Sequence, residues 1–127
     1  MVPRDTGRTG RFVIEESTMT AYAIAHLRDV DPNAEIAEYI SLIDETLAPF
    51  GGRFLIHGVT PEIMEEPWEG DLVVIAFPDR DAAHAWYASP AYQAILPLRT
   101  RNSRSAAVIL DGVPDGYRAA DFLAKLG

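Results

Sequence analysis

Tyr92, Ile95 and Arg99 occupy positions i, i+3 and i+7 of the segment AWYASPAYQAILPLR, which covers residues 85–99. In a helix these positions share one face, because residues three, four and seven apart lie above one another. A phenol hydroxyl and a guanidinium that point into one pocket would suit a carboxylate or an enolate, since the guanidinium can donate two parallel hydrogen bonds. The alternative is a structural Arg99 that forms an ion pair with an acid of the same chain or of a partner chain, since the chain contains many acids.

Two histidines are candidate general bases, because neutral imidazole is the usual base near pH 7. His26 lies in AYAIAHLR and His57 in RFLIHGV, two segments that are predicted to be strands. Alternation along the first segment places His26 on one face with Tyr22, which makes Tyr22 a further candidate for ligand binding. The alternative for either histidine is a hydrogen-bonded place in the core. No metal site is expected, because no H-x-H, H-E-x-x-H or E-x-x-H spacing occurs.

Four strands and two main helical regions are expected to position these side chains. The strands are predicted at residues 21–28, 53–59, 71–77 and 103–110. The first helix is predicted to have Asp31 as its N-cap and Pro32 as its first residue. Apolar residues at helical spacing form one stripe along it: Ile36, Tyr39, Ile40, Ile43 and Leu47.

The second helical region is predicted to start at the N-cap Asp79 and to continue in a second piece. Trp86 lies on its alanine-lined face and is expected in the core, because burial of an aromatic ring contributes strongly to stability. Ser89 and Pro90 repeat the N-cap and proline pattern and restart the helix. Pro97 is expected to end or kink this second piece.

The predicted order β-α-β-β-α-β defines an α+β fold with a four-stranded antiparallel sheet and both helices on one face. The strand DLVVIAF at residues 71–77 is apolar along both faces, so we expect both faces to be covered. A second copy of the sheet is the economical cover, which predicts a homodimer. Residues 1–18 are interpreted as an N-terminal extension and residues 19–111 as the domain. Residues 112–127 form a tail, predicted to be a short helix that packs on the domain or on the partner chain.

Composition excludes several classes of function. The chain has 127 residues, a formal net charge of −8 and no cysteine. Disulfides and thiolate metal sites are therefore excluded, and binding to nucleic acid or to an anionic membrane is not expected of so acidic a chain. No apolar run approaches the roughly 20 residues of a membrane span, and the first residues lack the apolar stretch of a signal peptide. These features predict a soluble cytoplasmic protein.

One long string supports a family resemblance. VVIAFPDRDAAHAWYASPAYQAILPLR, preceded by GGRFLIHG and EEPWEG, resembles domain-of-unknown-function family thirteen-thirty over about residues 21–110. The resemblance implies a ferredoxin-like domain of the dimeric α/β-barrel superfamily, which also contains antibiotic-biosynthesis monooxygenases, muconolactone isomerases and haem-degrading enzymes. The chain departs from the family pattern at His57, where relatives often have arginine, and at Trp68, which precedes Glu69 and Gly70 instead of following them. If that arginine binds an anion in relatives, His57 would do so only when protonated.

Three hypotheses about function follow. The first is a homodimeric domain, without cofactor, that binds a small anionic or aromatic metabolite in a cleft between sheet and helices. Five residues are predicted to line that cleft: Tyr22, His26, His57, Tyr92 and Arg99. The second is a cofactor-independent monooxygenase or isomerase, in which His26 or His57 abstracts a proton and Arg99 stabilises the oxyanion. The third is a structural or interaction module, which a filled sheet face would favour.

Overall fold

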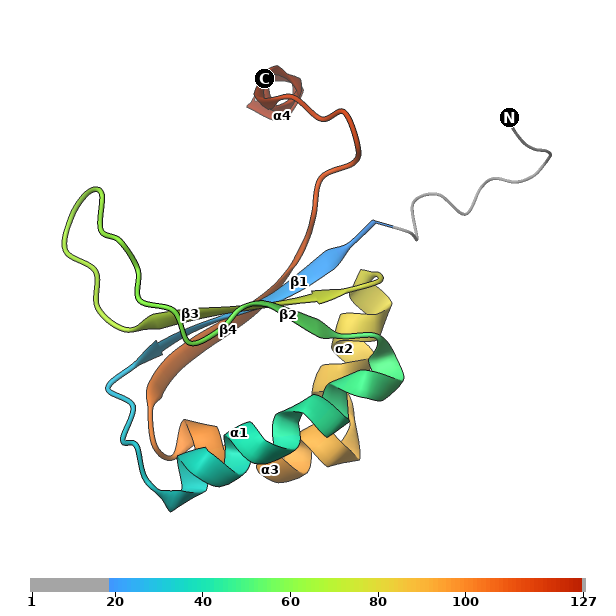
Figure 1. The fold of residues 1–127 in the computed structure, drawn as a ribbon. Coiled ribbons are helices and arrows are strands. Elements are labelled where there is room, and N and C mark those ends of the chain that lie inside the picture. Colours follow the sequence, from blue (N-terminus) through green and yellow to red (C-terminus); the bar gives the residue numbers. More distant parts are fainter. Residues whose placement is uncertain (1–18, 127) are drawn as a thin grey trace.

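The computed structural model describes residues 19–126, in which helices cover one face of a single antiparallel sheet (Figure 1). The elements are β1 (Ala21–Arg28), α1 (Ala34–Leu47), the 3-10 helix η2 (Ala48–Phe50), β2 (Arg53–Ile56), β3 (Asp71–Phe77), α2 (Arg80–Ala88), α3 (Pro90–Thr100), β4 (Arg104–Asp111), the 3-10 helix η3 (Ala119–Phe122) and α4 (Leu123–Leu126). The predicted N-terminal extension, residues 1–18, lies outside the described residues. No helix within residues 19–126 has the length and apolar character needed to cross a membrane.

The strand order β2-β3-β1-β4 makes β1 and β3 the central pair and leaves β2 and β4 at the edges. Every neighbouring pair is antiparallel. With α1, α2 and α3 on one side, this is the ferredoxin-like arrangement, and the predicted α+β fold class is confirmed. Four of the five buried residues of these strands lie in β3, from Val74 to Phe77, as its continuous apolar run predicts, and the fifth is Ala21 of β1.

Helix α1 begins two residues later than the sequence predicts. Asn33 is its N-cap: the Asn33 side chain accepts a hydrogen bond of 3.1 Å from the backbone nitrogen of Ile36. Asp31, the predicted cap, instead donates its backbone N–H to the carbonyl of Asn102. The amide of Asn33 donates to the Asn102 side chain at 2.6 Å. Asp31 and Asn33 are both able to cap the helix. The contacts of both residues with Asn102, which is distant in the sequence, decide which of them does so, and the local pattern could not show this.

The second edge strand is shorter than predicted. β2 ends at Ile56, because its pairing with β3 shifts register between Phe54 and Ile56. His57 consequently lies just after the strand, where the ladder no longer fixes its direction. An irregularity of this kind changes the direction in which the neighbouring side chains point.

The predicted restart between α2 and α3 is correct, and of the two effects expected of Pro97, an end or a kink of the helix, the end does not occur. The hydroxyl of Ser89 accepts from the backbone nitrogen of Tyr92 at 3.2 Å, and Pro90 is the first residue of α3. The helix continues through Pro97 to Thr100. Pro97 removes one backbone donor, which leaves the carbonyl of Gln93 to the solvent side of the helix, where both residues are exposed.

The core lies between the inner face of the sheet and the junction of the helices. Trp86 is 3% exposed, which confirms its predicted place. Its ring lies 4.1 Å from that of Tyr92 and 5.4 Å from that of Phe77. Its indole N–H donates to the hydroxyl of Thr46 at 2.9 Å. One side chain thus connects α1, α2, α3 and β3.

We expect Trp86→Ala to lower the free energy of unfolding by about 3–5 kcal/mol, because it opens a cavity at this junction. Trp86→Phe, which keeps much of the packing and loses the hydrogen bond to Thr46, should cost less. Chemical denaturation of the two variants beside the wild type measures the difference. Equal stability of Trp86→Ala and wild type would contradict the central role of this side chain.

Candidate ligand-binding site

A cavity of about 610 Å³ lies between the inner face of the sheet and the helices. Small side chains create it: Ala23 and Ala25 of β1 and Ala107 of β4 face the helices where larger residues would fill the space. Its helical wall includes Ile36, Tyr39, Ile43, Trp86, Tyr92 and Arg99. The volume falls within the range of about 300–1,000 Å³ that is usual for small-molecule pockets.

Arg99 brings a charge into this apolar wall from the last turn of α3. The residue is 6% exposed. Its Nη1 donates to the hydroxyl of Ser105 at 2.6 Å, and its Nη2 makes a long contact of 3.4 Å with the hydroxyl of Tyr92. Its guanidinium carbon lies 5.9 Å from the centre of the Tyr39 ring. All of these neighbours are neutral.

Within residues 19–126, no carboxylate forms an ion pair with Arg99. The ion pairs of this part of the chain are Arg80–Asp111, Arg101–Glu35, Arg104–Asp29 and Arg104–Glu69, and all four lie at the surface. The alternative of a structural Arg99 paired with an acid therefore finds no such acid in the described residues. A buried charge without a partner of opposite sign is costly, and proteins rarely keep one without a use for it.

The surroundings of Arg99 keep it charged. Burial acts to lower the pKa of the guanidinium, but the hydroxyls of Tyr92 and then Tyr39 outweigh it, and the pKa is raised. A guanidinium is in any case protonated throughout the pH range of folded proteins. The cavity therefore contains a permanent positive charge, held by side chains that cannot neutralise it.

Two tyrosines extend the polar group around Arg99. The hydroxyls of Tyr39 and Tyr92 lie 2.8 Å apart, and Tyr92 is only 2% exposed. Burial raises the pKa of Tyr39, and the neighbouring Tyr92 adds to the rise. Tyr39 thus remains protonated and can act as a hydrogen-bond donor, not as a base. Either hydroxyl can donate to the other; in the arrangement in which Tyr92 accepts from Arg99 and donates to Tyr39, the hydroxyl proton of Tyr39 is available to a ligand.

Tyr39 belongs to the apolar stripe of α1, and its part in this polar group is missing from the site predicted from the sequence. The available signal was that Tyr39 carries the one polar atom in a stripe that otherwise consists of isoleucine and leucine. A buried tyrosine hydroxyl usually needs a hydrogen-bond partner, and that requirement points to a polar neighbour on another element. Here the neighbour is on α3, which sequence spacing alone does not bring next to α1.

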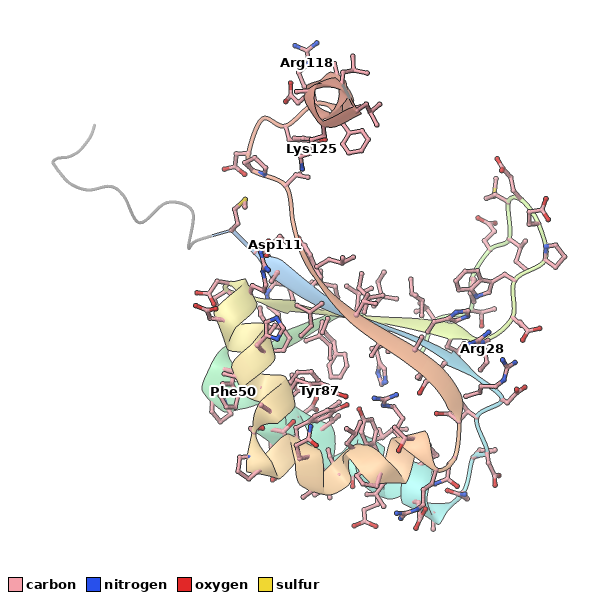
Figure 2. All side chains as sticks on the ribbon, turned by 180° about the vertical axis from the view of Figure 1, so that it is seen from behind. Arg28, Phe50, Tyr87, Asp111, Arg118 and Lys125 are labelled. Atoms are coloured by element: carbon pink, nitrogen blue, oxygen red, sulfur yellow. The ribbon has the colours of Figure 1, made fainter. Side chains whose placement is uncertain are left out.

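His57, Tyr92 and Arg99 all border the cavity, as predicted. His57 is exposed at the rim, where its ring lies 4.7 Å from that of Phe54. Tyr87 of α2 also borders the rim, and it lies beside the space between α2 and the sheet in Figure 2. The structure therefore brings three of the five predicted residues together.

The predicted place of Tyr22 and His26 in the cleft is wrong. Successive residues of a strand point to opposite faces, and it is Ala23, Ala25 and Leu27 of β1 that face the cavity. His26 lies on the other face of the sheet, where its ring stacks on Trp68 at 4.6 Å and its Nε2–H donates to the carbonyl of Glu69 at 2.8 Å. Through these two contacts His26 holds the loop between β2 and β3 against the sheet.

The fold and this cavity define a ferredoxin-like domain with an internal site, and the chain belongs to the family described as Domain of unknown function (DUF1330), whose members it matches over residues 20–113. A protein of unknown function from Rhodopseudomonas palustris is similar in structure, with a TM-score of 0.59 and 14% identity over 76% of this chain and 85% of that one. A dimeric ferredoxin-like protein of unknown function from Jannaschia sp. CCS1 has a TM-score of 0.57 and 15% identity, over 73% of this chain and 99% of that one.

A second dimeric ferredoxin-like protein of unknown function, from Thermobifida fusca YX, aligns with a TM-score of 0.52 and 19% identity over 74% of this chain and 92% of that one. No curated protein matches the chain. The family relationship predicted from the string at residues 73–99 is therefore confirmed. At these identities the structural similarity shows the fold, and the site must be interpreted from its own residues.

The absence of a counter-charge yields a stability prediction for Arg99→Met. Methionine fills similar space without a charge, and Ser105 keeps the hydroxyl of Ser103 as a neighbour at 3.5 Å. We expect the free energy of unfolding to fall by less than about 1 kcal/mol or to rise, because replacing buried charge by apolar atoms is often neutral or stabilising. Denaturant titration checks this. A loss of about 3 kcal/mol or more would identify Arg99 as a structural partner of a charge.

Proposed function

We propose that the chain is a homodimeric domain that binds a small, largely apolar anion in the cavity between sheet and helices. The observation that carries the proposal is the buried guanidinium of Arg99, which faces neutral hydroxyls and an apolar cavity. A carboxylate or enolate bound there would supply the missing negative charge. Folding has already removed water from the guanidinium of Arg99. A bound ligand would therefore add the negative charge without a further desolvation cost for Arg99.

The lining suggests the chemical class of the ligand. Aromatic rings of Trp86 and Tyr87 border the space from α2, and the ring of Phe54 borders it from β2, where aliphatic side chains of the sheet complete the wall. Tyr39 can donate to the second oxygen of a carboxylate while Arg99 donates to the first. An aromatic acid matches the apolar walls and the cationic end at Arg99, while the exposed side chain of Asp71 borders the cavity elsewhere. Because the chain has a net charge of −8, long-range electrostatics oppose such a ligand, and its affinity must come from contacts inside the cavity.

We propose no reaction for this site. Of the two histidines weighed as general bases, His57 borders the cavity at its exposed rim, whereas His26 is engaged with Trp68 and Glu69 on the opposite face. An enzymatic function of the monooxygenase or isomerase kind would therefore depend on His57. His57 is exposed to solvent, whereas a general base usually works in surroundings that exclude water.

Binding can be tested with benzoate and salicylate as acidic probes and with benzamide as their neutral counterpart. An acid at about 100 times its Kd should stabilise the wild type by roughly 2.7 kcal/mol, observed as a higher melting temperature, and benzamide should not. Arg99→Gln should abolish the shift, and Arg99→Lys should restore part of it, because an ammonium lacks the two-pronged geometry. Calorimetry then gives the affinities.

Arg101→Gln is the matched control for that experiment. Arg101 lies two residues further along, is exposed, and pairs with Glu35 at 2.8 Å, so its replacement should leave binding unchanged. Equal binding of the acids by Arg99→Gln and wild type would refute the proposed role of Arg99.

The homodimer is supported by the free face of the sheet, opposite the helices. Ile24 of β1 lies in register with Val74 of β3 and Val108 of β4, and these side chains share that face. Val108 and Leu110 are 49% and 52% exposed. An apolar face of this kind is unusual on a monomer and typical of an association surface. Two such sheets can pack about 10 Å apart.

Light scattering coupled to size exclusion should give about twice the 14.0 kDa chain mass at micromolar concentration. Val108→Glu places a charge on the free face and should convert the dimer to a folded monomer, since Val108 is half-exposed within one chain. Ala94→Glu, on an exposed position of α3, is the control that should remain dimeric. A monomeric wild type would refute the proposed homodimer.

A further inference from the structure

Two segments project from opposite ends of the sheet, both on the side away from the helices (Figure 1). The first is the C-terminal arm, residues 112–126, which follows β4. The second is the β2–β3 loop, residues 57–70. Asp111, where the arm begins, pairs with Ala21 at the start of β1, and Asp71, where the loop ends, is opposite Leu27 near its end. The two segments are therefore separated by roughly 20 Å of strand at about 3.3 Å per residue.

The C-terminal arm leaves its apolar side chains exposed. Phe122 is 47% exposed, and Leu123 and Leu126 are 65% and 67% exposed. The backbone nitrogen of Gly112 donates to the carbonyl of Thr20 at the start of the arm. Beyond Gly112, the hydrogen bonds of the described part of the arm are local, such as that from the backbone nitrogen of Arg118 to the side chain of Asp121 at 3.1 Å. Helical pieces as short as η3 and α4 are not stable in water by themselves. An apolar surface outside the arm is needed to hold them.

The β2–β3 loop offers such a surface. It surrounds a hollow of about 310 Å³ whose apolar lining comes from Pro61, Ile63, Met64 and Trp68. Met64 is 83% exposed and Ile63 is 57% exposed. The base of the loop lies close against β1. Trp68 stacks on His26, and the backbone at Gly70 approaches Leu27 so closely that any side chain there would collide with the carbonyl oxygen of Leu27. The hollow is thus presented on a fixed base.

The charges of the two segments bear on the orientation of a docked arm. The loop carries Glu62, Glu65, Glu66 and Glu69, with no lysine or arginine. The arm carries two cations, Arg118 and Lys125, and two anions, Asp115 and Asp121, so its net charge is zero, and Figure 2 places Arg118 and Lys125 far from the sheet. Attraction between exposed charges of this kind contributes little stability but favours one docking orientation over another.

Within one chain the two segments lie at opposite ends, but a two-fold dimer can bring them together. If two free sheet faces pack with their strands running in opposite directions, the arm end of one copy meets the loop end of the other. The faces would be about 10 Å apart. Residues 112–118 can span up to roughly 23 Å when extended, so the arm can cross from its own sheet to the partner.

We propose that the C-terminal arm of one copy docks into the hollow of the β2–β3 loop of a second copy, so that two reciprocal arms clasp the dimer. The occupant is a second copy of this chain, and the inference rests on the homodimer proposed above. Phe122 and Leu123 fill the hollow, while Arg118 and Lys125 lie near the glutamates at its edge.

Engineered cysteines test the contact directly, because the natural chain has none. Under mild oxidation, the double variant Met64→Cys/Phe122→Cys should form a covalent dimer, and peptide mapping should show residue 64 linked to residue 122 between chains. A mixture of the two single variants should give the same link. Met64→Cys/Ala94→Cys is the control, since Ala94 is on the helical side of the domain. Cross-linking no faster than this control, or a link within one chain, would overturn the clasp.

A second measurement separates failure of the clasp from failure of the dimer. Leu123→Asp/Leu126→Asp should raise the Kd of the dimer about tenfold or more, because it removes the apolar anchors of both arms, whereas Ala124→Asp, also in α4, should change it little. A wild type that is monomeric by light scattering refutes homodimer and clasp together. A dimer whose Kd is unaffected by Leu123→Asp/Leu126→Asp refutes the clasp alone. Ligand binding, measured by thermal shift with benzoate, is independent of both outcomes.

Discussion

A central strand can present each side chain to only one face of its sheet, and this constraint on β1 determines what the domain can do. Its small residues, Ala23 and Ala25, face the helices and leave room for the cavity. Its larger residues at alternate positions, Ile24 and His26 among them, face the other way, toward the proposed dimer surface and the β2–β3 loop. A shift of one residue in the register of β1 would fill the cavity and remove the anchor of the loop in the same step. Site and assembly surface thus depend on one alternating pattern.

The elements of the fold follow from patterns that act over a few residues. The Asp79 and Ser89 caps, the apolar run of β3 and the helical stripe of α1 each specify their element locally, and each was predictable. Two of the expectations that were wrong concern choices made by distant partners. Asn102 decides where α1 begins, and the pairing of β1 with β3 and β4 decides which of its faces meets the helices. The periodicity of β1 showed that His26 and Ala25 lie on opposite faces, but nothing local assigned either face to the helices.

Arg99 was predictable as a candidate because its spacing from Tyr92 survives Pro97, and both residues are buried on one face of α3. The spacing could not show which residues of other elements surround Tyr92 and Arg99. Ser105 enters from β4 and Tyr39 from α1, so the polar group is assembled from three elements that meet only in the folded chain. Its chemistry is that of hydroxyls and one permanent cation. Such a group can orient and neutralise an anion, but it contains no base of its own.

The cavity opens to solvent at a rim that includes the exposed residues His57 and Tyr87. It is therefore occupied by water or by a ligand. Water can be hydrogen-bonded by Arg99 and Tyr39 at the polar end, but the alanine and isoleucine walls offer it no partners. Water beside such walls is poorly held, and its displacement by the apolar body of a ligand is favourable. The same residues that create the space thus supply the driving force for filling it, while Arg99 selects the charge of the occupant.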